Sequence, residues 1–376
     1  MKIAFYAPMK SPDDAQPSGD RTIGRLLMAA LNRANCDVRL ASHLRTWSGV
    51  PDDGELLKFR HQAEQQAKTL IKTYSGNGCA TWRPDVWFTY HCYYKAPDLL
   101  GPAVAGALGI PYVITEASYS ARRADGAWSG WLAAAHASIT AADAVFSFTA
   151  RDKLSLHNVC PPQRLHDLSP FLDLEDTFDG LPSPARNVKH DAATPVRLVT
   201  VAMMRNGAKL ASYQLLAASL ERLLHCHWHL DIVGDGVARS DVEKAFSRIP
   251  SERIHWHGLQ DAPDLRRILM NGDLFAWPGI DEAFGMAYLE AQAAGLPVAA
   301  LRTAGVPEVV QHQQTGLLSD TAIPDGYARC LECLIQDQSL RDRLSAGART
   351  SVEAHHSLKA ASTRLGDVLR TLIRPI

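Results

Sequence analysis

The sequence lacks any long apolar run and any block rich in lysine and arginine. No window approaches the 18 or so apolar residues of a membrane-spanning helix, and the opening residues contain too short an apolar run for a signal peptide. The formal net charge of −1 argues against bulk electrostatic binding to nucleic acid. We therefore expect a cytoplasmic protein, with or without peripheral contact at the inner membrane surface, and no nucleic-acid partner.

A regular cysteine framework is also missing. The seven cysteines are scattered along 376 residues and are odd in number, which is not typical of a disulfide scaffold. Cys330 and Cys333 have the spacing of a redox or metal pair, but no second pair lies nearby. The sequence therefore predicts free thiols.

What is present is an alternation of short β-branched or aromatic runs with longer amphipathic ones. This pattern is typical of parallel sheets with crossover helices, and a hydrophobic content of 46% is enough for two cores. Both halves are predicted to be doubly wound α/β units. The predicted strands are Lys2–Ala7, Asp37–Ala41, Asp85–Tyr90, Tyr112–Thr115, Ala144–Phe148, Val196–Ala202, His227–Val233, Arg253–His257, Leu274–Trp277 and Pro297–Leu301.

The predicted helices and the linker set the domain boundaries. The stretch Asp173–Thr194 contains Gly and Pro without periodicity and is predicted to be the linker. We expect one domain at residues 1–180, a second at 181–356 and a final helical segment at 357–376. The main predicted helices are Thr22–Asn35, Glu55–Tyr74, Pro97–Leu108, Trp128–Ala142 and Leu358–Ile373.

The segment from Asp281 to Glu290 is the most informative part of the chain. Glu282 comes just before a predicted helix, where the first backbone N–H groups lack partners and attract an anion. A phosphate beside Ala283, Phe284, Gly285 and Met286 would meet these groups. Glu290 lies about 12 Å further along the helix, so the two carboxylates suit the ends of one elongated ligand rather than a single metal ion.

These residues resemble the signature of the family 4 retaining glycosyltransferases, in which two Glu residues are separated by seven positions. The resemblance continues through Ala291, Ala293, Gly295 and Pro297, and through the later segments at 305–310 and 315–318. It implies the GT-B fold, with two Rossmann-like domains facing across a cleft and a last helix that crosses back to the first domain.

The resemblance also assigns the donor site. It implies that Arg205 and Lys209 contact the donor diphosphate, where fixed cations stabilise the growing negative charge without a metal. Glu290 would accept hydrogen bonds from the ribose and Glu282 from the sugar. The alternatives are a helix-capping role for Glu282 and an exposed helix position for Glu290. Gly258 and Leu259 occupy the turn that faces the base. No cofactor is expected besides the nucleotide-sugar substrate.

In the first half, Gly19 matches the glycine-rich loop of the family that approaches the donor. Asp20, which follows it, has a helix-capping alternative. Many relatives place a His after the fourth strand, whereas this chain has Glu116, which would stabilise a developing positive charge or act as a nucleophile. His91, after the third strand, is a second catalytic candidate. The alternatives are a solvated strand end for Glu116 and a hydrogen-bonded structural histidine at a strand end for His91. Arg122 and Arg123 follow in a loop and would either bind an anionic acceptor or simply be solvated.

Two other patterns have competing interpretations. The alternating histidines of 225–229 and 255–257 suggest a metal cluster, but no carboxylate or cysteine completes a convincing set, so we predict no metal site. The predicted helix Glu55–Tyr74 would either pack on the core or dock on an anionic membrane.

The sequence therefore predicts a retaining, metal-independent glycosyltransferase. It would transfer a hexosyl unit from a nucleotide-diphosphate sugar to a hydroxyl of a glycan or lipid-linked acceptor. A GT-B nucleotide-sugar epimerase and a catalytically weak nucleotide-sugar-binding protein are the alternatives.

Overall fold

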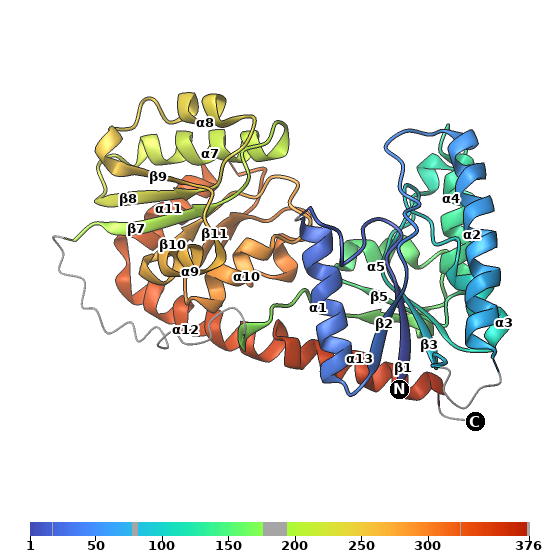
Figure 1. Ribbon diagram of the computed structural model, residues 1–376. Helices are drawn as coiled ribbons and strands as arrows, with labels where there is room; N and C mark the ends of the chain where they lie inside the picture. Colours follow the sequence, from blue (N-terminus) through green and yellow to red (C-terminus); the bar gives the residue numbers. More distant parts are fainter. Residues whose placement is uncertain (17, 77–81, 176–193, 324, 374–376) are drawn as a thin grey trace. The chain divides into compact units, whose positions relative to one another are not determined.

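The computed structural model describes residues 1–16, 18–76, 82–175, 194–323 and 325–373. By its internal contacts the chain divides into two units (Figure 1). Unit 1 contains Met1–Ser169 and Leu358–Ile376, and unit 2 contains Pro170–Ser357. The predicted boundary at residue 180 and most of the predicted linker lie outside the described residues.

Unit 1 contains a six-stranded parallel sheet in the order β2-β1-β3-β4-β5-β6. Its inner strands are almost continuously apolar and buried, as in β1, because helices cover both faces of such a sheet. The strands are β1 (Lys2–Tyr6), β2 (Asp37–Ser42), β3 (Val86–Cys92), β4 (Tyr112–Ala117), β5 (Ala144–Ser147) and β6 (Leu165–Asp167).

The helices of unit 1 lie in two layers (Figure 1). α1 packs against α13, so the last helix belongs to the unit formed by the first residues, while α2, α3 and α4 pack against one another. The bounds are α1 (Gly19–Arg33), α2 (Asp53–Tyr74), α3 (Gly101–Leu108), α4 (Ser129–Ala141), α5 (Ala150–Leu156), α13 (Leu358–Ile373) and the 3-10 turns η1 (Ala121–Arg123) and η2 (Pro162–Arg164).

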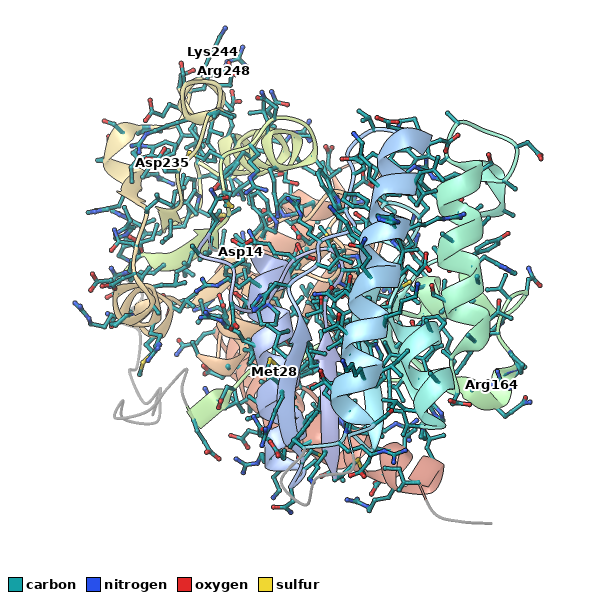
Figure 2. All side chains as sticks on the ribbon, turned by 45° about the vertical axis from the view of Figure 1, so that its right-hand side comes forward. Asp14, Met28, Arg164, Asp235, Lys244 and Arg248 are labelled. Atoms are coloured by element: carbon teal, nitrogen blue, oxygen red, sulfur yellow. The ribbon has the colours of Figure 1, made fainter. Side chains whose placement is uncertain are left out.

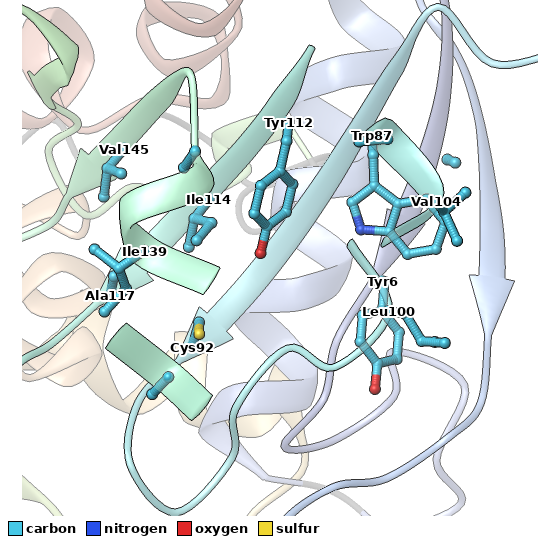
Figure 3. Packing of buried hydrophobic residues seen from close by; sticks show 14 of the residues in the cluster. Tyr6, Trp87, Cys92, Leu100, Val104, Tyr112, Ile114, Ala117, Ile139 and Val145 are labelled. Carbon is cyan, nitrogen blue, oxygen red and sulfur yellow. The ribbon is translucent and has the colours of Figure 1, made fainter. Parts of the chain in front are cut away.

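One layer of the core of unit 1 is built from large side chains of adjacent strands. Tyr6, Trp87 and Tyr112 are almost fully buried together with aliphatic residues of α3 and α4 (Figure 3). Asp98 is buried beneath them and accepts hydrogen bonds from the Tyr112 hydroxyl at 2.8 Å and the Gly101 N–H at 2.7 Å. A buried carboxylate of this kind is tolerated because its oxygens are hydrogen-bonded.

Unit 2 repeats the plan, with a six-stranded parallel sheet in the order β12-β11-β10-β7-β8-β9. Its strands are β7 (Val196–Val201), β8 (Trp228–Val233), β9 (Ile254–Gly258), β10 (Leu274–Ala276), β11 (Val298–Leu301) and β12 (Gly316–Ser319). Its helices are α7 (Ala208–Arg222), α8 (Arg239–Ala245), α9 (Ala262–Asn271), α10 (Met286–Ala293), α11 (Gly326–Gln336) and α12 (Gln338–His355), with 3-10 turns η3 (Ser251–Arg253) and η4 (Val306–Glu308).

The ten predicted strands are present, and their ends differ from the prediction by at most two residues. The short strands β6 and β12 were not predicted. α2 buries Leu56, Ala63, Ala67 and Tyr74. Of the two alternatives for this helix, the structure therefore supports packing on the core of unit 1. Among the described residues, no helix combines the length and the apolar character needed to cross a membrane.

Candidate functional site

The predicted donor residues of unit 2 gather where its strand order reverses. β7 and β10 are neighbours in the sheet, although β8 and β9 come between them in the sequence. Arg205 and Lys209 follow β7, while Glu282 follows β10. In open parallel sheets, the loops after two such strands separate and leave room for a ligand at the carboxyl edge.

An ion pair joins the two loops. The Lys209 ammonium donates a hydrogen bond to Oε2 of Glu282 and lies 5.5 Å from the centre of the Trp277 ring. The Trp277 indole N–H points to the same carboxylate oxygen, at 3.4 Å. Both charged side chains are partly buried, at 32% exposure for Lys209 and 17% for Glu282. Arg205 is exposed in the same loop, and its side chain forms no hydrogen bond or ion pair with another described residue.

The start of α10 has the shape of an anion site. Gly285 precedes the helix at φ = 73°, and no side chain caps the first N–H groups. A Cβ at this position would lie 2.6 Å from the Tyr288 ring, so the turn requires glycine. Ala283 is exposed and Phe284 is buried, which fixes one side of the loop in the core. The uncapped N–H groups of α10 and the Lys209–Glu282 pair therefore belong to one edge of unit 2.

Glu290 lies on α10, eight residues after Glu282. Its side chain is largely buried, and this burial raises the pKa of the carboxyl to about 7, with Arg266 favouring the charged form. No hydrogen bond joins its carboxylate to another described residue. A group with this environment and no partner is typical of a ligand-binding position.

Gly258 and Leu259 end β9 at the same edge. Gly258 has φ = 67°, and its carbonyl accepts a hydrogen bond from the Gly234 N–H at 2.8 Å. A Cβ at Gly234 would lie 2.0 Å from the Ala202 carbonyl oxygen, so the turns after β7 and β8 are in backbone contact. Leu259 is 73% exposed and projects from this rigid edge.

Unit 1 has its own reversal of strand order, between β1 and β3. Asp20, in the first turn of α1 after β1, forms a hydrogen bond with Nδ1 of His91 at the end of β3, at 3.0 Å. Glu116 lies on β4 beside His91, between the register pairs Tyr90–Thr115 and Cys92–Ala117. The predicted residues Asp20, His91 and Glu116 are therefore brought to one place by the sheet topology.

His91 and Glu116 both have left-handed backbone, with φ of 65° and 61°. This conformation is unfavourable for residues with a Cβ and is concentrated at functional sites. Oε2 of Glu116 is buried and has no hydrogen-bond partner among the described residues, and the same holds for Nε of Arg21 and the hydroxyl groups of Tyr90 and Thr115. Tyr90 was not predicted as a site residue, because only the structure shows that its hydroxyl group is buried.

The charges of this cluster are coupled. Burial raises the pKa of Glu116, although His91 opposes the shift. Burial lowers the pKa of His91, but Glu116 and Asp20 outweigh it, so the net shift is upward. Burial raises the pKa of Asp20, but its hydrogen bond to His91 more than reverses this, and the net shift is downward. The two acidic groups thus favour the charged form of His91.

Two predictions about the start of α1 have different outcomes. The capping alternative for Asp20 is wrong, because the Ser18 hydroxyl caps the helix by accepting from the Arg21 N–H at 3.2 Å. The Asp20 carboxylate is left free to reach His91. Gly19 is exposed and a Cβ there would meet no atom within 4 Å, so no contact within the described residues explains a glycine at this position.

The histidine pattern also needs a correction. We expected no carboxylate or cysteine to complete a set, but Asp231 approaches His255 and His257, and His225 lies beside Cys226 and Glu332, with the ligand atoms of each set within 4.8 Å of one another. Asp231 accepts a hydrogen bond from Nε2 of His257 at 2.7 Å, which satisfies both groups without a metal. The sequence argument missed Asp231 because its position opposite His255 depends on how β8 pairs with β9.

A cavity of about 560 Å³ in unit 2 contains none of the predicted donor residues. It lies between α7 and α8 and is lined in part by Lys244 and Arg248, which Figure 2 shows projecting at the end of unit 2. The predicted donor residues therefore lie at the carboxyl edge of the unit 2 sheet and not in this cavity.

Comparison with known proteins finds a family match over part of unit 2. Residues 195–337 match the family model described as glycosyl transferases group 1. The group 1 match falls entirely within unit 2 and includes Arg205, Lys209, Glu282 and Glu290. Unit 1, with its His91 cluster, lies outside it.

Two relatives share part of the chain. A sulfoquinovosyl transferase, SQD2, of Arabidopsis thaliana is 29% identical over 157 residues, which cover 41% of this chain and 30% of that protein. A D-inositol 3-phosphate glycosyltransferase of Corynebacterium kroppenstedtii is 24% identical over 238 residues, which cover 60% of this chain and 52% of the relative. The chain thus spans about a third to a half of the length of the curated relatives it matches.

The similarity in structure extends over nearly the whole chain. The Anabaena protein Alr3699/HepE, solved in complex with UDP, has a TM-score of 0.71 and 16% sequence identity, covering 99% of this chain and all of that one. At this identity the similarity establishes the fold. The two α/β units have the GT-B architecture, as the sequence predicted.

Proposed function

We propose that this protein is a retaining glycosyltransferase that moves a hexosyl unit from a nucleotide-diphosphate sugar to a hydroxyl of a glycan or lipid-linked acceptor, without a metal ion. The Lys209–Glu282 pair beside the uncapped start of α10 carries the proposal. Cations and free N–H groups bind a diphosphate, while a carboxylate at the same place binds sugar hydroxyls. The match of this segment to the group 1 glycosyl transferases supports the same reading.

The donor would lie along the carboxyl edge of unit 2. Its diphosphate would contact Lys209, Arg205 and the N–H groups at Gly285 and Met286. Glu282 would accept hydrogen bonds from the sugar. Glu290 would accept them from the ribose, because no hydrogen bond to another described residue occupies its carboxylate. Gly258 and Leu259 would border the base. Because Lys209 already faces Glu282, the cation is in place before the donor binds, which avoids reorganisation during the reaction.

In the reaction the bond between the anomeric carbon and the phosphate oxygen breaks, and a bond from the acceptor oxygen to the same carbon forms on the same face. The acceptor proton passes to the departing diphosphate. Lys209 and Arg205 stabilise the negative charge that grows on this leaving group. These two side chains supply the positive charge that a divalent metal would otherwise provide.

Unit 1 would supply the acceptor-side groups. Glu116 and His91 are held in strained backbone, and Oε2 of Glu116 has no hydrogen-bond partner among the described residues. Its carboxyl could therefore accept a hydrogen bond from an incoming hydroxyl or donate one to it, or stabilise positive charge at the reacting sugar. Gly19 leaves open space beside this cluster, which is consistent with close approach of a ligand.

The test is a transfer assay with protein treated with EDTA. UDP-, GDP- and ADP-hexoses are mixed with a panel of sugar and lipid-linked acceptors, and the product is analysed by NMR. UDP-hexoses come first, because the similar Anabaena structure is described with UDP. A new glycosidic bond with the donor's anomeric configuration is expected. An inverted product would contradict retention, and conversion of the donor without an acceptor would favour an epimerase.

A further inference from the structure

A continuous set of aromatic rings extends outward from His91 in unit 1. The His91 and Tyr93 rings have centroids 4.8 Å apart, those of Tyr93 and Tyr94 are 5.4 Å apart, and those of Tyr94 and Trp128 are 5.0 Å apart. Tyr93, Tyr94 and Trp128 are each partly exposed. We call these three side chains the aromatic platform. It links the candidate catalytic cluster to the surface of the same unit.

Two cations lie over this platform. The guanidinium carbon of Arg123 is 4.2 Å from the centre of the Tyr94 ring. The Lys95 ammonium is 5.9 Å from the Tyr94 ring and 5.5 Å from a Trp128 ring. Within the described part of the chain, neither cation forms an ion pair with a carboxylate. Their positive charge is balanced only by the ring faces and by solvent, which leaves both able to pair with an anion.

The aromatic platform is not simply part of the buried hydrophobic core. Trp131 is fully buried in the core, whereas Trp128 is partly exposed and contacts the Trp131 ring edge to face, at 5.8 Å between ring centres. The turn that carries the platform is fixed, because Tyr93 and Ala96 exchange backbone hydrogen bonds and the Trp47 indole donates to the Tyr93 hydroxyl at 3.1 Å. Fixed, partly exposed aromatic rings beside cations are typical of binding surfaces.

We propose that the aromatic platform, with Lys95 and Arg123, is an acceptor subsite for an anionic sugar. The apolar face of the sugar ring would lie on the aromatic rings, and its phosphate or carboxylate group would pair with the two cations. The Lys95 ammonium lies near the Tyr94 and Trp128 rings, so an anionic group paired with Lys95 would bring the attached sugar ring onto these two rings. This inference rests on the proposed transferase function, since it defines the class of acceptor that unit 1 receives.

The experiment measures binding of four probes to the full chain by NMR saturation transfer and calorimetry. The probes are glucose 6-phosphate, glucuronate, glucose and inorganic phosphate. We expect at least one of the two anionic sugars to bind roughly tenfold more tightly than either glucose or phosphate, because both parts of the subsite are needed. The preference between phosphate and carboxylate then identifies the anion.

Three variants locate the binding. The double substitution Lys95→Gln and Arg123→Gln should remove the preference for the anionic sugar, and Tyr94→Leu should weaken binding of the sugar part. Lys72→Gln removes one positive charge from an exposed position in the last turn of α2, and its effect should be less than roughly threefold because no contact among the described residues joins Lys72 to the platform. Circular dichroism melting checks that Tyr94→Leu remains folded, with Tyr94→Phe as the variant that keeps the ring.

UDP binding to the same samples separates this proposal from the function on which it rests. If UDP binds and anionic sugars do not, or if glucose or free phosphate binds as well as the anionic sugar, the subsite is wrong while the donor site stands. Unchanged affinity in the double variant also overturns it. If anionic sugars bind the platform but no nucleotide binds unit 2, the subsite stands and the proposed transfer function fails.

Discussion

His91 and Glu116 occupy neighbouring positions of β3 and β4, and both have left-handed backbone in a sheet whose other described residues include no further non-glycine residue with positive φ. Two such residues at adjacent strand ends store strain of about 1–2 kcal/mol each. The sheet topology places Asp20 against His91 as well. This strain is expected where side chains must be held for function.

A substitution that relieves the backbone strain at Glu116 should change stability and activity in opposite directions. Glu116→Gly should raise the free energy of unfolding by about 1 kcal/mol, because glycine accepts φ = 61° and the buried carboxyl is removed. Transfer activity should fall by about 100-fold. Thermal melting and initial rates check both effects.

The matched control is Gln313→Gly in unit 2, where φ is 63° and the side chain is exposed. It should give a similar gain in stability with unchanged activity. Full activity in Glu116→Gly would remove Glu116 from the mechanism, while Glu116→Gln separates loss of the charge from loss of the side chain.

The Asp20–His91 hydrogen bond should stabilise unit 1 only at lower pH. The pKa of His91 is raised in the folded protein, so this stabilisation is complete below the pKa of an unfolded histidine and is lost as the pH rises through the folded pKa. Asp20→Asn should therefore destabilise the protein at pH 6 and much less at pH 9.

NMR titration of the His91 ring should show a lower pKa in Asp20→Asn. Asp13→Asn, at an exposed carboxylate of the same loop region, controls for the change of charge. An unchanged His91 titration would mean that the hydrogen bond does not form in solution.

Lys209 should act on the leaving group. Lys209→Gln is expected to lower kcat by about 10²–10³-fold, because one positive charge is removed from the departing diphosphate. Lys244→Gln on α8, beside the separate cavity of unit 2, removes the same charge without contacting the site and should leave the rate unchanged. Equal losses in both variants would point to a general electrostatic effect.

Much of this fold follows from the sequence because buried parallel strands are nearly continuous apolar runs. β6 and β12 were missed, since three or four residues such as Leu165–Asp167 carry too little pattern to separate a strand from a loop. The parallel order of each sheet, which decides which loops meet, depends on long-range pairing. The donor residues were found only because their spacing resembles a known signature.

Other site features depend on contacts between segments far apart in the chain. Nothing in the sequence near Asp20 indicates His91, 71 residues later, as its partner. The left-handed backbone of Glu116 has no sequence signal, because glycine or asparagine would be the usual residue there. The approach of Trp128, which precedes α4, to Tyr94, which follows β3, likewise depends on tertiary packing and not on any local motif.

Glu290 links stability to pH in unit 2. Burial raises the pKa of Glu290 from 4.5 to about 7. The folded state therefore binds this proton more tightly than the unfolded state does. The resulting contribution to the free energy of unfolding is complete below pH 4.5 and is lost as the pH rises through 7. Glu290→Gln should therefore stabilise the protein at pH 8, by about 1–3 kcal/mol, with little effect near pH 4.5. Urea unfolding at the two pH values measures the difference, and Glu353→Gln at an exposed helix position is the control.

Two glycines should respond differently to alanine. Gly285→Ala places a Cβ 2.6 Å from the Tyr288 ring in left-handed backbone, so it should destabilise unit 2 by about 2 kcal/mol or more and abolish donor binding. Gly19→Ala has open space and should fold as the wild type does. A fall in transfer rate in Gly19→Ala would show that a ligand uses this space, whereas an unchanged rate would remove Gly19 from the site.

The most direct test of the donor site is calorimetric titration of UDP-, GDP- and ADP-sugars into metal-free wild-type protein and into Glu290→Ala. We expect one nucleotide sugar to bind the wild type, and its affinity to fall by about tenfold or more in Glu290→Ala, because the carboxylate that receives the ribose hydroxyls is gone. Absence of binding by every donor, or binding that is unaffected by Glu290→Ala, would contradict the assignment of the donor site to the carboxyl edge of unit 2.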